Sequence, residues 1–179
     1  MKTLVVYSSK TGNTKKVAEA VKSAMPEGCE IHPVENAPDP SDYDFVAMGF
    51  WVDKGLPDTM AQSYMKKIKG LNLGVFGTLG AWPDSGHARN CMEEALKMLE
   101  SNNVLATFMC QGKVDPRLME MMAKQNIESH AMTPERKARL EEAAKHPDDN
   151  DLKNAAEIFG KAIEELKAAM VCGAVTHSS

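Results

Sequence analysis

Long apolar runs are missing from this chain of 179 residues. No stretch approaches the roughly 18 consecutive apolar residues that a membrane-spanning helix needs, so we expect no membrane span. The first apolar run, residues 4–7, is too short for the hydrophobic region of a signal peptide. Both absences predict a cytoplasmic protein.

Cysteine is scarce and dispersed. The four cysteines form no C-x-x-C pair, which argues against a disulfide framework or a cysteine-bound metal and fits a reducing compartment. The five histidines are scattered, and none stands at metal-ligand spacing from an acidic residue or a cysteine. We therefore expect no metal site.

Charge of neither sign dominates the chain. Lys and Arg number 21 against 25 Asp and Glu, which gives a net charge of -4. The absence of a basic cluster excludes nucleic acid and anionic membrane surfaces as expected partners. The mild excess of acid favours protein partners with basic surfaces.

Three motifs of common α/β enzymes are also absent. Without G-x-x-x-x-G-K-[ST] there is no lysine or magnesium ligand for a nucleoside triphosphate. Without G-x-G-x-x-G a dinucleotide site is disfavoured, and without G-x-S-x-G there is no hydrolase nucleophile elbow.

Apolar runs alternate with helical patterns along most of the chain. The expected strands cover residues 3–7, 30–34, 43–49, 71–77 and 104–110. The expected helices cover about residues 14–25, 57–69, 85–100 and 151–170. Strict alternation predicts parallel strands joined by right-handed crossovers. We therefore expect an α/β fold of three layers, a doubly wound five-stranded parallel sheet with helices on both faces.

One segment, at about 112–150, interrupts the alternation between the fifth strand and the last helix. Asp115-Pro116 has the form of a helix start and leads into residues 118–122. Thr133-Pro134 starts a second, charged helix that ends near His146. We expect a helical excursion within a single domain that covers residues 1–172, followed by a tail at 173–179.

The stretch YSSKTGNT, residues 7–14, joins the first strand to the first helix. Backbone amides and the positive end of a helix dipole meet at such a junction and favour an anion. Hydroxyl groups supply further donors, and Asn13 tolerates a left-handed turn. The alternative is a polar turn in which Thr14 merely caps the helix. The candidate phosphate ligands are Ser8, Ser9, Lys10, Thr11, Gly12, Asn13 and Thr14.

Two further loops follow the third and fourth expected strands, and each holds one of the chain's two tryptophans. A planar aromatic ligand between Trp51 and Trp82 would give both rings a partner. The alternative is that either ring covers a sheet edge or a protein interface. The candidates in these loops are Phe50, Trp51, Val52, Asp53, Gly55, Thr78, Leu79, Gly80, Ala81 and Trp82. Gln111 either bonds a ligand edge or satisfies the end of the fifth strand.

The motif S-x-T-G-N-T, residues 9–14, resembles the FMN-phosphate loop of flavodoxins. The likeness covers about residues 1–111 and 151–170, and it implies the strand order 2-1-3-4-5. It also implies FMN as cofactor, with the flavin ring between the two tryptophan loops. The third-strand loop departs from the family, because Gly55 lies four residues after Trp51 and Lys54 adds a cation near the ring. Which backbone carbonyl meets flavin N5 therefore stays open.

The resemblance implies an electron carrier that shuttles single low-potential electrons between redox partners, a reductase donor and an acceptor enzyme. Such a carrier would be a monomer or weak dimer rather than a stand-alone enzyme. The alternative is a flavodoxin-like FMN oxidoreductase that acts on a quinone or a tetrapyrrole-type substrate. A third possibility is a binding module that has the fold without the cofactor.

Overall fold

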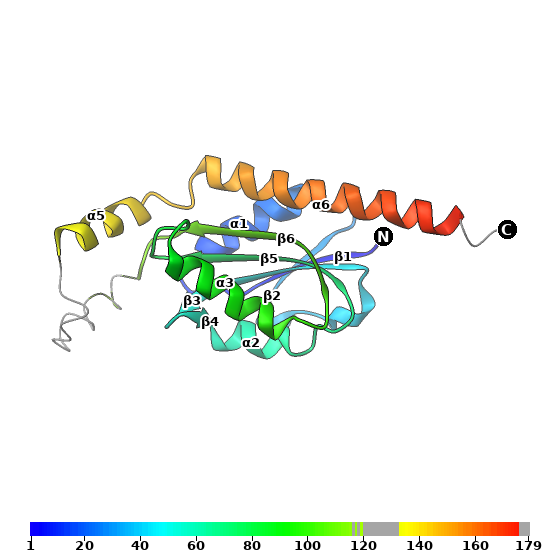
Figure 1. Cartoon of the computed structure of the whole chain (residues 1–179), viewed down its shortest axis with the longest axis horizontal. Coiled ribbons are helices and arrows are strands. Elements are labelled where there is room, and N and C mark those ends of the chain that lie inside the picture. The colour runs from blue at the N-terminus through cyan, green and yellow to red at the C-terminus, as the bar shows by residue number, and fades with distance from the viewer. Residues whose placement is uncertain (116, 118, 120–132, 176–179) are drawn as a thin grey trace.

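A parallel sheet between two layers of helices organises the chain (Figure 1). The structure is a computed structural model, and it describes residues 1–115, 117, 119 and 133–175. Residues 173–175 are described by their backbone alone. The parallel strands are β1 (Thr3–Tyr7), β2 (Glu30–Pro33), β3 (Phe45–Asp53), β5 (Asn72–Leu79) and β6 (Asn103–Gln111). Their order is β2-β1-β3-β5-β6, which confirms the predicted order 2-1-3-4-5.

The helices divide between the two faces of the sheet. Figure 1 shows α1 (Asn13–Ser23) and α6 (Asp149–Val175) over one face, with α2 (Thr59–Met65) and α3 (Gly86–Met98) over the other. Two short 3-10 turns, η1 (Val34–Asn36) and η2 (Pro40–Asp42), connect β2 to β3. Right-handed crossovers between parallel strands produce this arrangement.

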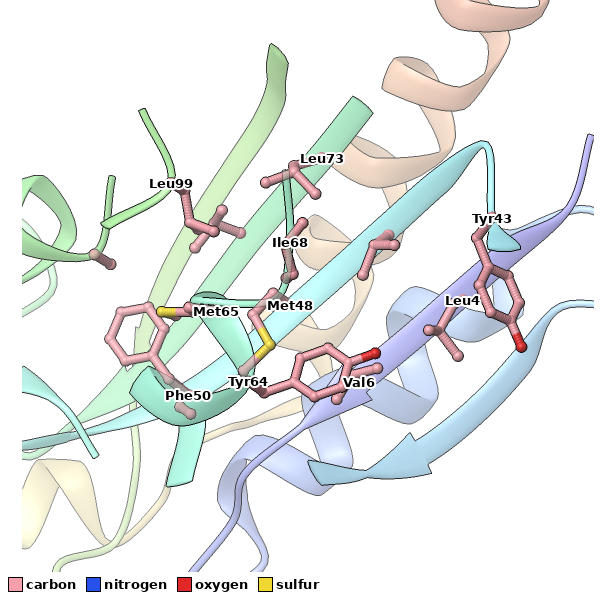
Figure 2. Packing of buried hydrophobic residues seen from close by; sticks show 14 residues of the cluster. Leu4, Val6, Tyr43, Met48, Phe50, Tyr64, Met65, Ile68, Leu73 and Leu99 are labelled. Atoms are coloured by element: carbon pink, nitrogen blue, oxygen red, sulfur yellow. The ribbon is translucent and has the colours of Figure 1, made fainter. Parts of the chain in front are cut away.

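Each face of the sheet has its own hydrophobic core. Side chains alternate along a strand, so Leu4 and Val6 enter the core under α2 and α3, while Val5 enters the core under α1 and α6. Figure 2 shows the first of these cores. In the second, the rings of Phe76 and Phe159 meet edge to face with centroids 5.7 Å apart. Burial of both faces explains why the strands are continuously apolar.

The third strand is longer than predicted, and a short strand was missed. We expected β3 to end at residue 49 and a loop to follow, but β3 runs to Asp53 and turns back into β4 (Leu56–Pro57). β4 pairs antiparallel with β3, so the sheet has six strands. The two turn residues, Lys54 and Gly55, have φ of 50° and 86°, the positive values of a type I′ hairpin turn.

The helix boundaries also differ in places from the sequence pattern. α2 begins at Thr59 rather than residue 57, because Asp58 caps it by accepting from the backbone amides of Met60 and Ala61. α6 begins at Asp149 and continues to Val175. None of the helices within the described ranges is long and apolar enough to cross a membrane.

The predicted excursion is described in part. The carboxylate of Asp115 accepts a hydrogen bond from the backbone amide of Arg117. The backbone carbonyl of Asp115 accepts from the backbone amide of Met119. The rest of the expected first helix, at 116, 118 and 120–122, lies outside the described residues. The second expected helix is α5 (Pro134–Ala143), and the side chain of Thr133 caps it as predicted.

Candidate cofactor site

The loop between β1 and α1 turns sharply at Gly12. Gly12 has φ of +88° and is the N-cap of α1. The sequence analysis suggested Asn13 for the left-handed position, but Gly12 occupies it. Asn13 is the first residue of the helix. The turn directs the first amides of α1 out of the carboxyl edge of the sheet.

Several hydrogen-bond donors of this loop stay available to a ligand. The amide of Lys16 donates to the carbonyl of Gly12 at 3.1 Å, and the amide of Lys15 donates to the Ser9 hydroxyl at 3.2 Å. The amides of Asn13 and Thr14 precede the first full turn and have no acceptor within the helix. The loop therefore presents backbone donors at the positive end of a helix dipole.

The hydroxyls of Ser9 and Thr11 add two donors. Ser9 Oγ accepts from Lys15, and Thr11 Oγ1 accepts from Asn13 Nδ2 at 2.9 Å. A hydroxyl that accepts a bond keeps its own proton free to donate. Together with the amides, these hydroxyls could bind a phosphate group.

Three other hydroxyls of the candidate set, on Ser8, Thr14 and Thr78, hold the loop to the rest of the protein instead. Thr14 is 1% exposed, and its Oγ1 lies 2.9 Å from Oγ1 of Thr78 on β5. Ser8 is 4% exposed and donates through Oγ to Asp58 at 2.7 Å. We therefore assign Thr14, Thr78 and Ser8 to positioning the loop.

Asp58 is a site residue that the sequence analysis missed. It is buried and accepts from the Ser8 hydroxyl, and its Oδ2 lies 3.4 Å from the amide of Trp51. Its own amide donates to the Trp51 carbonyl at 3.0 Å. Asp58 thus joins the phosphate loop to the β3–β4 hairpin while it caps α2. An Asp directly before a helical pattern is the signal that could have found it.

The two tryptophans lie at the same edge of the sheet, because Trp51 on β3 pairs with Thr78 at the end of β5. Trp51 is partly buried, and the ammonium group of Lys10 lies 5.2 Å from the centre of its ring. Trp82, in the loop after β5, is 44% exposed. The Lys10 contact brings the phosphate loop to the first tryptophan.

The remaining candidates in the tryptophan loops fall into three groups. Phe50 is fully buried in the core under α2 and α3, where its ring lies against Gly77, and Val52 packs against the same core. Asp53 and Gly55 belong to the hairpin. Leu79 is the last residue of β5, and Gly80 and Ala81 begin the second tryptophan loop.

The segment that leaves β6 completes this edge of the sheet, and the sequence analysis missed its role. The side-chain amide of Asn13 donates to the Lys113 carbonyl at 2.9 Å, and the Gly112 amide donates to the Leu79 carbonyl at 2.9 Å. A Cβ at Gly80 would clash with Cγ2 of Val114. Residues 112–114 therefore contact both the phosphate loop and the second tryptophan loop. No motif in the sequence indicated these contacts.

A cluster of titratable groups lies where α5 meets α6. Ligand atoms of His146, Asp148 and Asp151 lie within 4.8 Å of one another, a grouping that the scattered histidines had not suggested. Asp148 and Asp151 cap α6 by accepting from each other's backbone amide at 2.9 and 3.1 Å. The hydrogen bond that the imidazole of His146 donates to the carboxylate of Asp151 raises the pKa of His146. Capping and this ion pair account for the cluster.

The family model named Flavodoxin domain matches residues 4–160. The chain belongs to the flavodoxin domain family. Its relatives include a flavodoxin-like domain-containing protein BilS of Clostridioides difficile, 32% identical over 180 residues that cover 96% of this chain and 100% of that one. A BilS protein of Clostridium symbiosum is 30% identical over 173 residues that cover 85% of this chain and 90% of that one.

Solved flavodoxins share the fold of this flavodoxin-family chain. A flavodoxin from the domain Archaea aligns with a TM-score of 0.56 and 17% identity, over 93% of this chain and 99% of that one. Oxidised Flavodoxin 1 from Bacillus cereus aligns with a TM-score of 0.55 and 18% identity, over 92% and 98%. Family membership supports FMN as the cofactor of this flavodoxin-family protein.

The residues present fit FMN at both of its ends. The free amides of α1 with the hydroxyls of Ser9 and Thr11 suit a phosphate monoester. Trp51 and Trp82 offer aromatic surface to a planar ring at the same sheet edge. This flavodoxin-family site thus joins an anion-binding end to an aromatic end.

Proposed function

We propose that this protein binds FMN at the carboxyl edge of its sheet and carries electrons between protein partners. The observation that supports the proposal most strongly is the loop of residues 8–14, whose free donors stand at the start of α1 beside Trp51. When bound, FMN supplies the electron transfer. The protein's own residues bind the phosphate and hold the ring.

The roles of individual residues follow from their bonds. Ser9, Thr11 and the first amides of α1 bind the phosphate, while Thr14 and Ser8 fix the loop through Thr78 and Asp58. Trp51 and Trp82 contact the ring. Lys10 belongs to the phosphate loop, and its ammonium group lies over the Trp51 ring. This cation would raise the reduction potential of the bound flavin relative to a site without it.

A carrier needs no acid or base group that exchanges protons with a substrate at the ring. Burial raises the pKa of the Cys110 thiol, so the buried cysteine nearest this edge stays protonated at neutral pH. The chain's acidic balance supports protein partners with basic surfaces. A cytoplasmic location and a monomeric or weakly dimeric state belong to the same proposal.

Titration of the ligand-free protein with FMN and with riboflavin tests the phosphate site. Thr11→Val should weaken FMN binding by roughly ten-fold or more, since it removes a hydrogen bond to a charged group, and should leave riboflavin binding unchanged. Thr107→Val, at an exposed position of β6, is the matched control. Equal affinity of the wild type for FMN and riboflavin would contradict the phosphate assignment.

A redox titration separates the carrier from the alternative oxidoreductase. The carrier predicts two separate one-electron steps during reduction and no steady-state oxidation of NADH in the presence of a quinone. Rapid turnover of NADH and quinone by the purified protein would favour the oxidoreductase. A protein that takes up no FMN would be a binding module that has the fold alone.

A further inference from the structure

Gln111, the last residue of β6, carries a buried donor without a partner. The residue is 2% exposed, and its Nε2 has no hydrogen-bond acceptor among the residues that the structure describes. The alternative in which Gln111 satisfies the end of the strand therefore fails for the amide nitrogen. A buried donor left unpaired lowers the stability of the ligand-free protein, and such groups in native structures call for an explanation.

The position of Gln111 in the strand shows which face of the sheet it occupies. Met109 packs against the core under α2 and α3, whereas Cys110 belongs to the core under α1 and α6. Side chains alternate along a strand, so Gln111 lies on the same face as Met109. The Thr14–Thr78 bond, which fixes the phosphate loop, lies on the α1 side.

Gln111 therefore lies next to the start of the second tryptophan loop. It pairs with Leu79, the last residue of β5, and the chain continues from Leu79 through Gly80 to Trp82. The next residue, Gly112, donates its amide to the carbonyl of Leu79. The unpaired donor therefore lies at a strand end next to the loop that carries Trp82, one of the two rings assigned to the ligand's planar head.

We propose that the side-chain amide of Gln111 donates to a carbonyl oxygen of that planar head and so selects the ring of the bound cofactor. The proposal rests on the proposed function, since it needs a flavin at this edge. An amide NH2 can only donate, so its partner is an acceptor, and the ring of a flavin carries carbonyl oxygens. The phosphate binds to the other donors described above. Gln111 thus contributes to ligand affinity and lowers the stability of the ligand-free fold.

Gln111→Leu tests the proposal because it moves two measurements in opposite directions. The Tm of the ligand-free protein should stay the same or rise, since the variant removes an unpaired buried donor while it keeps the volume. The affinities for FMN and for riboflavin should both fall by about ten-fold or more. Protection of the ligand-free protein by inorganic phosphate should not change. Gln111→Met, an unbranched replacement, gives the same result by a second route.

Gln62 provides the matched control, because its Nε2 already donates to the Pro57 carbonyl at 2.6 Å. Gln62→Leu should lower the Tm and leave the affinity for riboflavin unchanged. A Gln111→Leu variant that loses stability but keeps wild-type flavin affinity would overturn the proposal, since it would show a structural bond such as one to a buried water. Wild-type protein that binds no FMN would instead overturn the proposed function, and this proposal with it.

Discussion

Gly12 shows how a single backbone angle supports the candidate phosphate loop. A Cβ at Gly12 would meet nothing within 4 Å, yet the φ of +88° disfavours any L side chain. Gly12→Ala should therefore cost about 1–2 kcal/mol in the free energy of unfolding, measured by urea titration. It should also weaken FMN binding, because relief of the strain turns the first amides of α1 away from the phosphate.

Gly28 separates these two effects. It has φ of +82° and equally open space at its Cβ, but it lies before β2 and away from the site. Gly28→Ala should show a similar loss of stability with unchanged affinity for FMN. If Gly28→Ala weakened FMN binding as much as Gly12→Ala, the effect on affinity would come from general instability.

The directions of single side chains were the part that the sequence could not supply. The strand–loop–helix junction at residues 7–14 was predictable from local pattern, including its small and hydroxyl-bearing residues. Which hydroxyls face a ligand depends on partners far along the chain. Thr14 meets Thr78 across 64 positions, and Ser8 meets Asp58 across 50. Only the packing of α1 and α2 on the sheet brings these pairs together.

The β3–β4 hairpin offers a prediction at the level of the element. Lys54 adopts a positive φ of 50°, which costs free energy for a side chain other than Gly, Asn or Asp. Lys54→Asn creates the Asn-Gly pair that type I′ turns prefer. We expect the variant to raise the free energy of unfolding by about 0.5–1 kcal/mol, measured by urea titration.

Lys66 is the control for this substitution. It caps the end of α2 with φ of -61° and ψ of -21°, in the right-handed region, so Lys66→Asn relieves no strain. A similar stabilisation in both variants would mean that loss of a lysine charge, and not the turn geometry, is responsible.

The hairpin also marks the limit of prediction from pattern for the elements. The main strands and helices follow from the alternation of apolar runs, and their order was predictable from the flavodoxin resemblance. Lys-Gly is a weaker turn signal than Asn-Gly, and the apolar residues Phe50 to Val52 could belong equally to a loop. Pairing of Phe50 and Trp51 with Gly77 and Thr78 extends β3, and that pairing is a tertiary interaction.

At the scale of the whole molecule, the excursion is tied to the body at both of its ends. The amide of Lys113 donates to the carbonyl of His146 at 3.3 Å, and the carbonyl of Lys113 accepts from Asn13 of the phosphate loop. The imidazole of His146 bonds Asp151 of α6, and its Nε2 lies 3.5 Å from Glu142 of α5. The corner at His146 thus connects α5, α6 and the exit of β6.

This corner predicts a pH-dependent stability of the fold. The hydrogen bond that His146 donates to Asp151 is the largest of the effects that raise the pKa of His146 above its ordinary value of 6.5, and Glu142 and Asp148 raise it further. The folded state therefore binds the proton more tightly than the unfolded state does. The stabilisation is fully present below pH 6.5 and is lost as the pH rises through the folded-state pKa.

Urea unfolding of wild type and His146→Gln between about pH 6 and pH 9 measures this contribution. The wild type should be the more stable protein at the acid end, and the difference should shrink toward the alkaline end as the imidazole loses its charge. Asp151→Asn removes the main partner, so a second His146→Gln change in that background should have a much weaker pH dependence. Parallel stability curves for wild type and His146→Gln across the range would show that the ion pair does not hold the corner.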